Sequence, residues 1–553
     1  MFTIFEKSLP KNSHTDKLLV NIRKSAEDFK DKEIKDLTFS KFRDFFETGK
    51  RVSYEDEYIE HRKRLNAFLF LCLNGEDYIS ELEDSIWAVC NEFTWSLPAH
   101  LRGKTVSEMS CVIDLFSAET AFTLSELLSL TEDIINPTVA ERIRFEVKRR
   151  IIQPYLNGET KIPCIKNNWD AVCGCGVGAS VLYLCDKKDA EKVIPDVINS
   201  MNSFLESYDE DGCCKEGPLY WEYGFGYFCY CADLLYKYTD GKINLFSSEK
   251  VHNIALYRQK IVLDKDDVIP FSDASHNFTF YAGLSDYLAV VYDDVISVPL
   301  DSETLFEYDY RYRTAAMLRS FYWYDASVKR GSASCGRYTF DTAMQYIFRN
   351  DKFVLAVKGG NNSEPHNHND LGSFVLYTAE DGFVFDDPGW PDYDGTYFSG
   401  ERYKNICASS KGHSTLMIDG KEQLFGENIK TEVLRAGESF VKMDLSSAYG
   451  VKAVRSFEIK DNTVIISDIV DTDLPVIQRF VTRIKPEVCD DGIITVGKAK
   501  INVQGSTFDM IKTDTFRPRL NICRCDMKEN ETLHIIDFSI DIPKNGAKVI
   551  ISL

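Results

Sequence analysis

Apolar residues recur at helical spacing from roughly residue 15 to residue 300 of the chain. Several segments carry apolar residues at positions i, i+3 and i+4, which is the pattern of a helix with one buried face. These segments are 61–74, 78–93, 114–130, 139–156 and 171–185. Proline and glycine separate them, so helices of similar length alternate with short connections. Serial helices of this kind predict stacked helical hairpins, arranged either as a toroid or as a solenoid.

The period of the pattern changes near residue 336. Beyond it, apolar residues alternate with polar ones or run in short bursts, which Gly, Asn and Asp separate. This pattern is typical of antiparallel strands joined by turns. We therefore expect a helical domain over residues 1–305, a junction over 306–335, and an antiparallel β-sheet domain, built as a sandwich, over 336–553. A chain of 553 residues is also too long for one core.

The composition of the chain limits which molecules the protein can bind and where it is expected to act. The formal net charge of −21 argues against nucleic acid and against an anionic membrane surface. An aromatic content of 13% suits stacking on sugar rings as well as ordinary core packing. Many of the 16 cysteines lie in apolar patterns, so we expect reduced structural thiols. The first residues lack an apolar signal core, and no run reaches the roughly 18 apolar residues of a membrane span, so we expect a cytoplasmic location.

Three of the nine histidines lie in polar, turn-rich stretches beside strand patterns: His366, His368 and His413. In a strand, residues i and i+2 point to the same face, so His366 and His368 would project together. Imidazole and carboxylate are the usual protein ligands of a zinc-like ion. The H-x-H pair, with a later Asp (Asp386 or Asp387) and the later His413, would therefore build a metal site with one imidazole left for chemistry. An isolated H-x-H pair would be a surface coincidence.

Two polar clusters lie in the helical half. Residues 166–170 (KNNWD) precede a helix pattern, and an Asn there caps the helix or binds a ligand. Residues 216–224 (EGPLYWEYG) hold a Gly-Pro turn followed by Tyr220 and Tyr223. A tyrosine beside such a turn is either packed in the core or exposed. If it is exposed, a neighbouring cation lowers its pKa from about 10, and it can exchange protons with a substrate.

Together these motifs resemble the heparinase II/III-like polysaccharide lyases. The resemblance rests on HNHNDLGSF, the DPG turn, ERY with the later SSKGH, and NNWDAVC followed by EGPLYWEYG, with weaker support from residues 92–122. These motifs occur in the order of the family and at roughly its spacing. The resemblance implies an incomplete (α/α) toroid followed by antiparallel β-sheets. It also implies β-elimination at a uronic acid in a glycosaminoglycan-like or alginate-like chain.

The resemblance also implies roles for individual residues. Asn168 matches the residue that neutralises the uronate carboxylate, Tyr220 the base and acid, and His366 a histidine that assists at the site. Trp169 stands where several family members carry a further histidine. Tyr220 would then perform both proton transfers, as in the heparinase III-like branch. Tyr223 is a rival to Tyr220.

A metal triad and a set of cleft residues follow from the same resemblance. His368, Asp387 and His413 match ligands of a divalent ion, which we expect to be zinc in a structural role. Asp386 is a rival to Asp387. The implied substrate-binding residues are Trp95, His100, Glu119, Trp169, Tyr223, Arg402 and Tyr403. Trp95 and His100 would alternatively serve helix capping and core packing.

The expected partner is an acidic oligosaccharide or polysaccharide, such as hyaluronan, chondroitin or heparan. The negative charge of the protein favours short chains over a long polyanion. Three alternatives stay open: an alginate or oligoalginate lyase, a glycoside hydrolase, and a non-catalytic carbohydrate-binding protein. The carboxylates available to a hydrolase are Asp114, Glu119, Glu216 and Glu222. The oligomeric state is open, a homodimer being one option.

Overall fold

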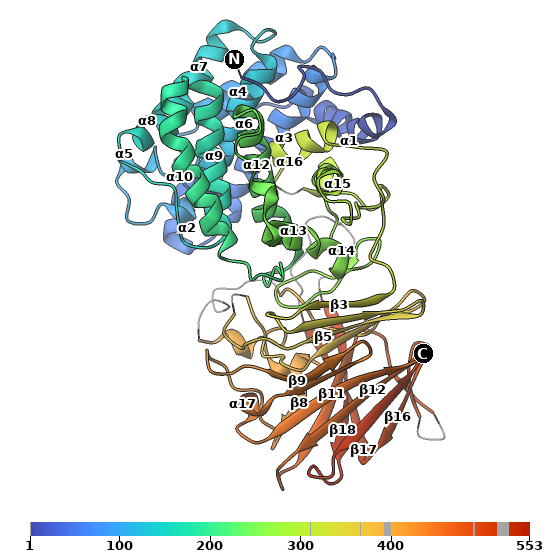
Figure 1. Ribbon diagram of the computed structural model, residues 1–553. Coiled ribbons are helices and arrows are strands. Elements are labelled where there is room, and N and C mark those ends of the chain that lie inside the picture. The colour runs from blue at the N-terminus through green and yellow to red at the C-terminus, as the bar shows by residue number, and fades with distance from the viewer. Residues whose placement is uncertain are drawn as a thin grey trace. The chain divides into compact units, whose positions relative to one another are not determined.

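The computed structural model describes residues 2–309, 311–364, 366–391, 397, 400–489, 493–516 and 530–553. The chain forms two compact units, one mainly helical and one built around β-sheets (Figure 1). The helical unit comprises Met1–Tyr208, Tyr220–His252 and Thr279–Arg330, and the sheet unit comprises Asp209–Leu219, Asn253–Phe278 and Gly331–Leu553. The sheet unit therefore takes in two segments that precede the change of period in the sequence.

The five predicted helical segments are all helical in the structure, and the pattern that predicts them is that of their buried faces. The longer helices of this unit are α1 (Ser13–Lys30), α2 (Phe39–Thr48), α3 (Val52–Leu73), α4 (Ile79–Asn91), α6 (Leu115–Thr131), α7 (Pro137–Val147), α9 (Asn168–Leu184), α10 (Lys187–Leu205), α12 (Gly226–Tyr238), α15 (Ala282–Val291) and α16 (Thr314–Tyr322). The shorter ones are η1 (Pro98–His100), α5 (Val106–Met109), η2 (Lys148–Ile152), α8 (Gln153–Leu156), η3 (Trp221–Phe225), η4 (Leu245–Ser247) and η5 (Phe306–Tyr308). Two further helices, α11 (Pro218–Tyr220) and α13 (Glu249–Ala255), have residues in both units.

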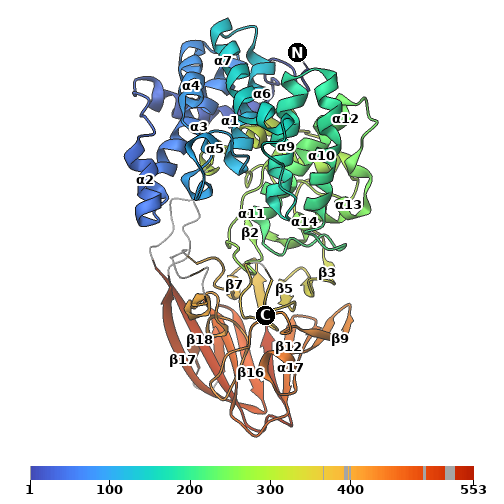
Figure 2. The same cartoon turned by 90° about the vertical axis from the view of Figure 1, so that its left-hand side faces the viewer.

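Helix α9 is fixed by close contacts on opposite sides (Figure 2). A Cβ atom on Gly176 would lie 2.5 Å from the carbonyl oxygen of Ala118 in α6, and one on Gly178 would lie 3.0 Å from Val197 in α10. Residues two apart on a helix point to nearly opposite sides, so the glycines allow both neighbours to approach. The start of α9, which carries Asn168, is therefore held firmly in the unit.

The sheet unit is antiparallel throughout its described strand pairs. A five-stranded sheet has the order β3 (Gly336–Phe340), β4 (Gln345–Arg349), β5 (Phe353–Lys358), β6 (Phe374–Thr378), β7 (Gly382–Phe385). A larger sheet, eight-stranded within the described residues, has the order β14 (Glu487–Val488), β15 (Ile494–Val496), β16 (Ala499–Gln504), β19 (Ala547–Ser552), β12 (Thr463–Val470), β11 (Ala453–Lys460), β10 (Phe440–Asp444), β9 (Glu432–Gly437). A four-stranded sheet has the order β17 (Ser506–Phe516), β18 (Glu531–Ile540), β13 (Val476–Thr482), β8 (Leu416–Ile418). The smaller elements are β1 (Val262–Asp264), β2 (Asp267–Val268), α14 (Tyr257–Ile261), η6 (Arg402–Lys404), η7 (Ser410–Gly412) and α17 (Ser446–Tyr449).

One hydrophobic core joins the three larger sheets. The ring of Phe374 in β6 lies 5.6 Å from Phe457 in β11 and 5.7 Å from Phe480 in β13, between ring centroids. Phe385, at the end of β7, lies 5.5 Å from Phe480. This shared core confirms the predicted antiparallel sandwich, and it anchors the strand ends from which the histidine-bearing loops depart.

Two expectations about the whole chain can be compared with the structure. Within the described residues, no helix combines the length and the apolarity that crossing a bilayer requires. The cysteines that the structure describes are free thiols, and most of them are buried. Their burial agrees with the predicted role as small apolar residues.

Candidate functional site

The loop between β5 and β6 carries His366 and His368, whose rings converge on the carboxylate of Asp273. His366 Nδ1 lies 2.7 Å from Asp273 Oδ2, and His368 Nε2 lies 3.1 Å from Asp273 Oδ1. The two histidines are not in a strand, as the sequence argument assumed, because His366 has a positive φ of 56° and belongs to a turn. The shared carboxylate, rather than strand alternation, brings the rings together.

Asp273 is stabilised as an anion. The hydroxyl of Tyr397 donates to its Oδ1 at 2.6 Å, and Arg402 Nη2 lies 3.6 Å from its Oδ2. Burial alone would raise the pKa of Asp273, but the hydrogen bonds from His366 and His368 outweigh it, so the pKa is held below its usual range. A carboxylate that stays ionised can orient both imidazoles.

Four buried side chains of the sheet unit form a group that is suited to a metal ion. Each of His368, Asp370, Asp387 and His413 offers one ligand atom, and these atoms all lie within 4.8 Å of one another. His413 Nδ1 lies 3.1 Å from Asp387 Oδ2, and His368 Nδ1 lies 3.9 Å from Asp387 Oδ1. Asp387 follows β7, and His413 follows η7, just before β8. The fold therefore brings the three predicted ligands together and adds Asp370.

The hydrogen bonds of His368 and His413 leave one nitrogen of each ring, Nδ1, without a proton and beside the carboxylates of the four-residue group. His413 Nε2 donates to the carbonyl of Cys407 at 2.8 Å, which leaves Nδ1 without a proton in the neutral ring. His368 Nε2 donates to Asp273, and His368 Nδ1 is buried without a hydrogen-bond partner, as is Asp370 Oδ1. Buried polar atoms without partners cost free energy, and a divalent cation would satisfy them. The donor set of two imidazoles and two carboxylates fits a zinc-like ion.

The pKa values in this group follow from the same contacts. Burial would lower the pKa of His413, but the carboxylate of Asp387 outweighs it and raises the pKa. Burial also lowers the pKa of His368, which favours the neutral ring that a metal ligand requires. The side chain of Lys358 donates to Asp370 Oδ2 at 2.8 Å, so one oxygen of that carboxylate is already engaged.

Asp386, the rival to Asp387, points elsewhere. Its carboxylate pairs with His276 Nε2 at 2.7 Å and with Arg483. These residues line a cavity of about 380 Å³ together with Trp390, among others. Successive residues at the end of a strand point to opposite sides, which explains why Asp386 and Asp387 have different partners.

Arg402 and Tyr403 form hydrogen bonds to the loop between β5 and β6 that carries His366 and His368, called the histidine loop below. Arg402 Nη2 donates to the carbonyl of Asn367 at 2.8 Å, and the hydroxyl of Tyr403 donates to Asn367 Oδ1 at 3.3 Å. Glu216 also reaches this loop, with its Oε2 3.5 Å from His366 Nε2. Burial raises the pKa of Glu216.

The two other predicted catalytic residues, Asn168 and Tyr220, belong to the helical unit. Asn168 is the first residue of α9, behind the cap formed by Asn167, whose side chain accepts from Trp169 N at 2.9 Å. Tyr220 immediately precedes η3, a π-helical turn of the kind often found at functional sites. A Cβ atom on Gly224 of η3 would lie 3.2 Å from Asn168 Cβ. Gly224 is one turn after Tyr220, so α9 and η3 bring Asn168 and Tyr220 into the same neighbourhood. Both are half-buried.

The side chain of Tyr223 is held by a carboxylate. Its hydroxyl is hydrogen-bonded to Glu119, and burial together with that carboxylate raises the pKa of Tyr223 well above its ordinary value. Arg313 Nε lies 3.1 Å from Glu119 Oε1, and its guanidinium carbon lies 4.2 Å from the centre of the Tyr223 ring. A tyrosine hydrogen-bonded to a carboxylate is poorly suited to act as a base, so the geometry argues against Tyr223 in that role.

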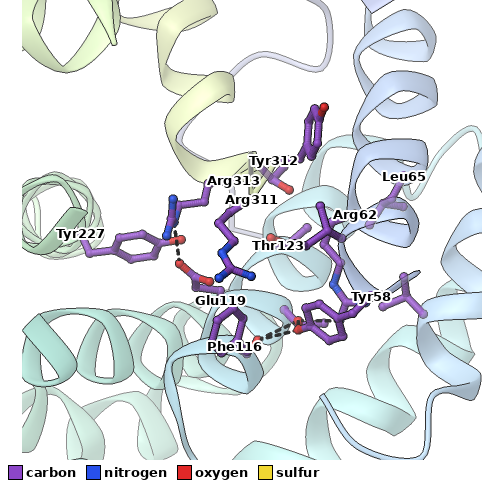
Figure 3. A pocket seen from close by; sticks show the side chains of 14 residues that line it. Tyr58, Arg62, Leu65, Phe116, Glu119, Thr123, Tyr227, Arg311, Tyr312 and Arg313 are labelled. Carbon is purple, nitrogen blue, oxygen red and sulfur yellow. Dashed lines mark hydrogen bonds and ion pairs between the residues drawn. The ribbon is translucent and has the colours of Figure 1, made fainter. Parts of the chain in front are cut away.

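Figure 3 shows the surroundings of Glu119, which points toward Arg313. Arg62 and Arg311 line the same cavity. The cavity measures about 30 Å³, far below the roughly 300 Å³ and more of ordinary ligand pockets. Glu119 therefore acts in the structure as a partner for Arg313 and Tyr223, in a space that accommodates water rather than a sugar ring.

The remaining predicted cleft residues divide into two groups. The ring of Trp169 lies 4.9 Å from that of His100, whose Nδ1 lies 2.6 Å from Asp114 Oδ2, so these residues gather beside Asn168. The structure corrects the prediction that Trp95 binds substrate. Only 1% of its surface is exposed, and its indole N–H donates to the carbonyl of Val89. Trp95 packs in the core and has no surface to offer a substrate.

Three of the four carboxylates available to a hydrolase, Asp114, Glu119 and Glu222, are engaged in structural contacts, whereas Glu216 lies beside His366. Asp114 caps α6, and Glu222 Oε1 accepts the backbone N–H of Tyr281 at 2.6 Å. Sequence reasoning missed Asp273 and Asp370. Asp370 follows His368 by two residues in an obvious polar motif, whereas Asp273 lies in a stretch that carries no comparable signal.

One segment in the C-terminal half of the chain matches a known family. Residues 339–476 match the family described as Heparinase II/III-like, C-terminal. This stretch contains the histidine loop, both aspartates after β7, and His413. No curated protein matches the chain by sequence.

Solved structures share the fold of the whole chain. A heparinase III has a TM-score of 0.64 at 13% identity, covering 100% of this chain and 86% of that one. Heparan sulfate lyase HepC from Pedobacter heparinus has a TM-score of 0.61 at 14% identity, covering 97% of this chain and 88% of that one. Chondroitin AC lyase from Streptomyces coelicolor A3, in complex with chondroitin sulphate, has a TM-score of 0.52 at 10% identity, covering 100% of this chain and 80% of that one.

These matches confirm the predicted architecture of a helical toroid followed by an antiparallel β-sandwich. At such identities a structural likeness establishes the fold alone, and the family match covers part of the sheet region. The chain thus has the fold of heparinase III, and its residues 339–476 match the family described as Heparinase II/III-like, C-terminal.

Proposed function

We propose that this protein is a polysaccharide lyase that cleaves a uronic-acid-containing glycan of the glycosaminoglycan type by β-elimination. The solved structures that share its fold are named as lyases of heparan sulfate and chondroitin, which supports this class of reaction. The observation that supports the proposal is the close approach of Gly224 to Asn168, because it places the start of α9 beside the helical turn that follows Tyr220. An amide and a phenol are the groups that elimination at a uronic acid needs.

The proposed chemistry uses the residues in turn. Removal of the C5 proton of a uronic acid pushes negative charge onto a carboxylate that is already anionic. The amide of Asn168 stabilises that charge by hydrogen bonding where it develops. Tyr220, as tyrosinate, takes the C5 proton, and the resulting phenol donates it to the departing O4. The C4–O4 bond breaks as the C4–C5 double bond forms. Within the sheet unit, Asp273 orients the ring of His366, which can donate a hydrogen bond to the glycan.

A zinc ion held by His368, Asp387 and His413, with Asp370 as a further ligand, fits this proposal as a structural element. When bound, it would neutralise the buried carboxylates and fix the loop that carries His366. Short acidic oligosaccharides are the proposed substrates, since the net charge of −21 opposes the approach of a long polyanion.

The test is the ultraviolet absorbance of the unsaturated product. Purified protein is given oligosaccharides of hyaluronan, chondroitin, heparan and alginate, and Tyr220→Phe and Tyr223→Phe are assayed in parallel. We expect absorbance to rise with the native protein and with Tyr223→Phe, and to vanish with Tyr220→Phe. The member of the panel that reacts identifies the glycan.

Other outcomes would overturn the proposal. Saturated fragments detected by mass spectrometry, without absorbance, would mean hydrolysis. Equal activity in Tyr220→Phe and the native protein would remove Tyr220 from the reaction.

A further inference from the structure

Phe425 is a large apolar side chain in an exposed position of the sheet unit. Its relative exposure is 63%, and that of the preceding Leu424 is 52%. Single exposed apolar residues are common and need no explanation by themselves. Phe425 differs because of how its backbone is held and where its ring lies.

The backbone on both sides of Phe425 is tied to the histidine loop by buried amide side chains. Gln423 Oε1 accepts the N–H of Leu371 at 3.0 Å, and Gln423 Nε2 donates to the carbonyl of Leu371 at 2.7 Å. On the same side, Asn362 Nδ2 donates to the carbonyl of Leu424 at 2.8 Å. On the other side, the N–H of Gly426 donates to the backbone carbonyl of Asn362 at 3.2 Å. Gln423 and Asn362 are 3% and 1% exposed. The exposed ring is thus presented by a rigid turn.

The ring of Phe425 lies beside a second aromatic ring that contacts the histidine loop directly. The centroids of Phe425 and Tyr403 are 4.8 Å apart, with their planes 35° from parallel. The hydroxyl of Tyr403 donates to Asn367, the residue between the two loop histidines. The aromatic pair therefore connects the histidine loop, through Asn367, to an exposed face.

We propose that the exposed ring of Phe425, backed by Tyr403, is a stacking platform for one pyranose ring of the glycan. This inference rests on the proposed function and deepens it. The apolar C–H face of a pyranose stacks on aromatic rings, and 63% of the surface of Phe425 is exposed for such a contact. Stacking also supplies affinity without positive charge, which suits an acidic protein that binds an acidic sugar.

The test compares steady-state kinetics on the oligosaccharide that the native protein cleaves best. We expect Phe425→Ala to raise KM about tenfold with kcat within about twofold, because the lost stacking affects binding and not the chemical step. Phe425→Tyr should keep the native KM, since it retains the ring. Leu434→Ala is the matched control, because Leu434 is an exposed apolar residue of the same unit, at 46% exposure in β9.

A binding measurement separates this inference from the proposed function. The same oligosaccharides are titrated calorimetrically into Tyr220→Phe and into Tyr220→Phe/Phe425→Ala. Native catalysis with KM and affinity unchanged in the Phe425→Ala variants would overturn the platform and leave the lyase intact. Absence of unsaturated product, with an affinity that falls when Phe425 is removed, would overturn the lyase and support the platform. A loss in Leu434→Ala as large as that in Phe425→Ala would also overturn the platform.

Discussion

Replacement of Gly224 by alanine tests whether the contact between α9 and η3 positions the catalytic residues. The added methyl would lie 2.8 Å from Phe204 Cε2 and 3.2 Å from Asn168 Cβ, whereas carbon atoms prefer about 3.5–4.0 Å. Phe204 is 2% exposed, so its ring has little room to withdraw. Overpacking of this size costs about 1–3 kcal/mol, and exchanging glycine for alanine within a helix returns up to about 1 kcal/mol. We expect the free energy of unfolding to fall by about 0–2 kcal/mol.

The expected effect on catalysis is larger than the effect on stability. To accept the methyl, Asn168 and η3 must separate by several tenths of an ångström, and misplacement of about 1 Å costs on the order of 10²-fold in rate. We therefore expect kcat/KM of Gly224→Ala to fall between about tenfold and about 100-fold, as measured by the absorbance of the unsaturated product. Stability is measured in parallel by urea unfolding.

Gly178→Ala is the matched control. A methyl on Gly178 would lie 3.0 Å and 3.2 Å from the two Cγ atoms of Val197. It therefore overpacks α9, the helix that begins with Asn168, but at a position far from Asn168. This variant should lose a similar amount of stability and keep native kcat/KM. If both variants keep native activity, or both lose it equally, the contact between Gly224 and Asn168 does not position the site.

The remaining predictions concern the metal group and the effect of pH. Asp387→Asn is expected to lose the bound metal in elemental analysis of the purified protein, while Asp386→Asn keeps it; metal retained by Asp387→Asn would contradict the ligand assignment. Burial would raise the pKa of Glu92, but Arg62 and His61 outweigh it and lower the pKa from its usual 4.5. A lowered pKa in the folded state means that the stabilisation by Glu92 is complete above about pH 4.5 and is lost as the pH falls below it. The free energy of unfolding of Glu92→Gln, measured with urea, should therefore depend less on pH below about 4.5 than that of the native protein. An equal pH dependence in both would show that Glu92 contributes nothing to the loss of stability in acid.

Local patterns were enough to predict most of the architecture. Segments such as 61–74 and 114–130 have apolar positions at helical spacing, and the structure has α3 and α6 there. The predicted helix over 139–156 is interrupted by the π-helical turn η2 just before Pro154, whose missing N–H cannot continue the helical ladder. The sequence pattern therefore predicts which segments are helical better than it predicts how each one is wound.

The site was predictable where its residues lie in compact motifs. His368, Asp387 and His413 follow or precede short strands, and the sandwich brings those strand ends together. Asp273 could not be recognised in the same way, because its role depends on a contact with residues about a hundred positions later. Trp95 looked like a cleft residue since large aromatics serve both in cores and at sugar sites, and burial, which the sequence does not show, distinguishes the two.

The position of Asp273 in the chain constrains how this protein can be divided or recombined. The carboxylate that orients His366 and His368 comes from the segment Asn253–Phe278, which lies outside the family match over 339–476 and is followed by further helices. A gene fragment that encodes only residues 331–553 would carry every strand of the sandwich and all the metal ligands, yet it would lack this carboxylate. A fragment or a recombined gene therefore preserves the orientation of both histidines only if it also encodes Asn253–Phe278, a segment that lies in the sequence between two parts of the helical unit.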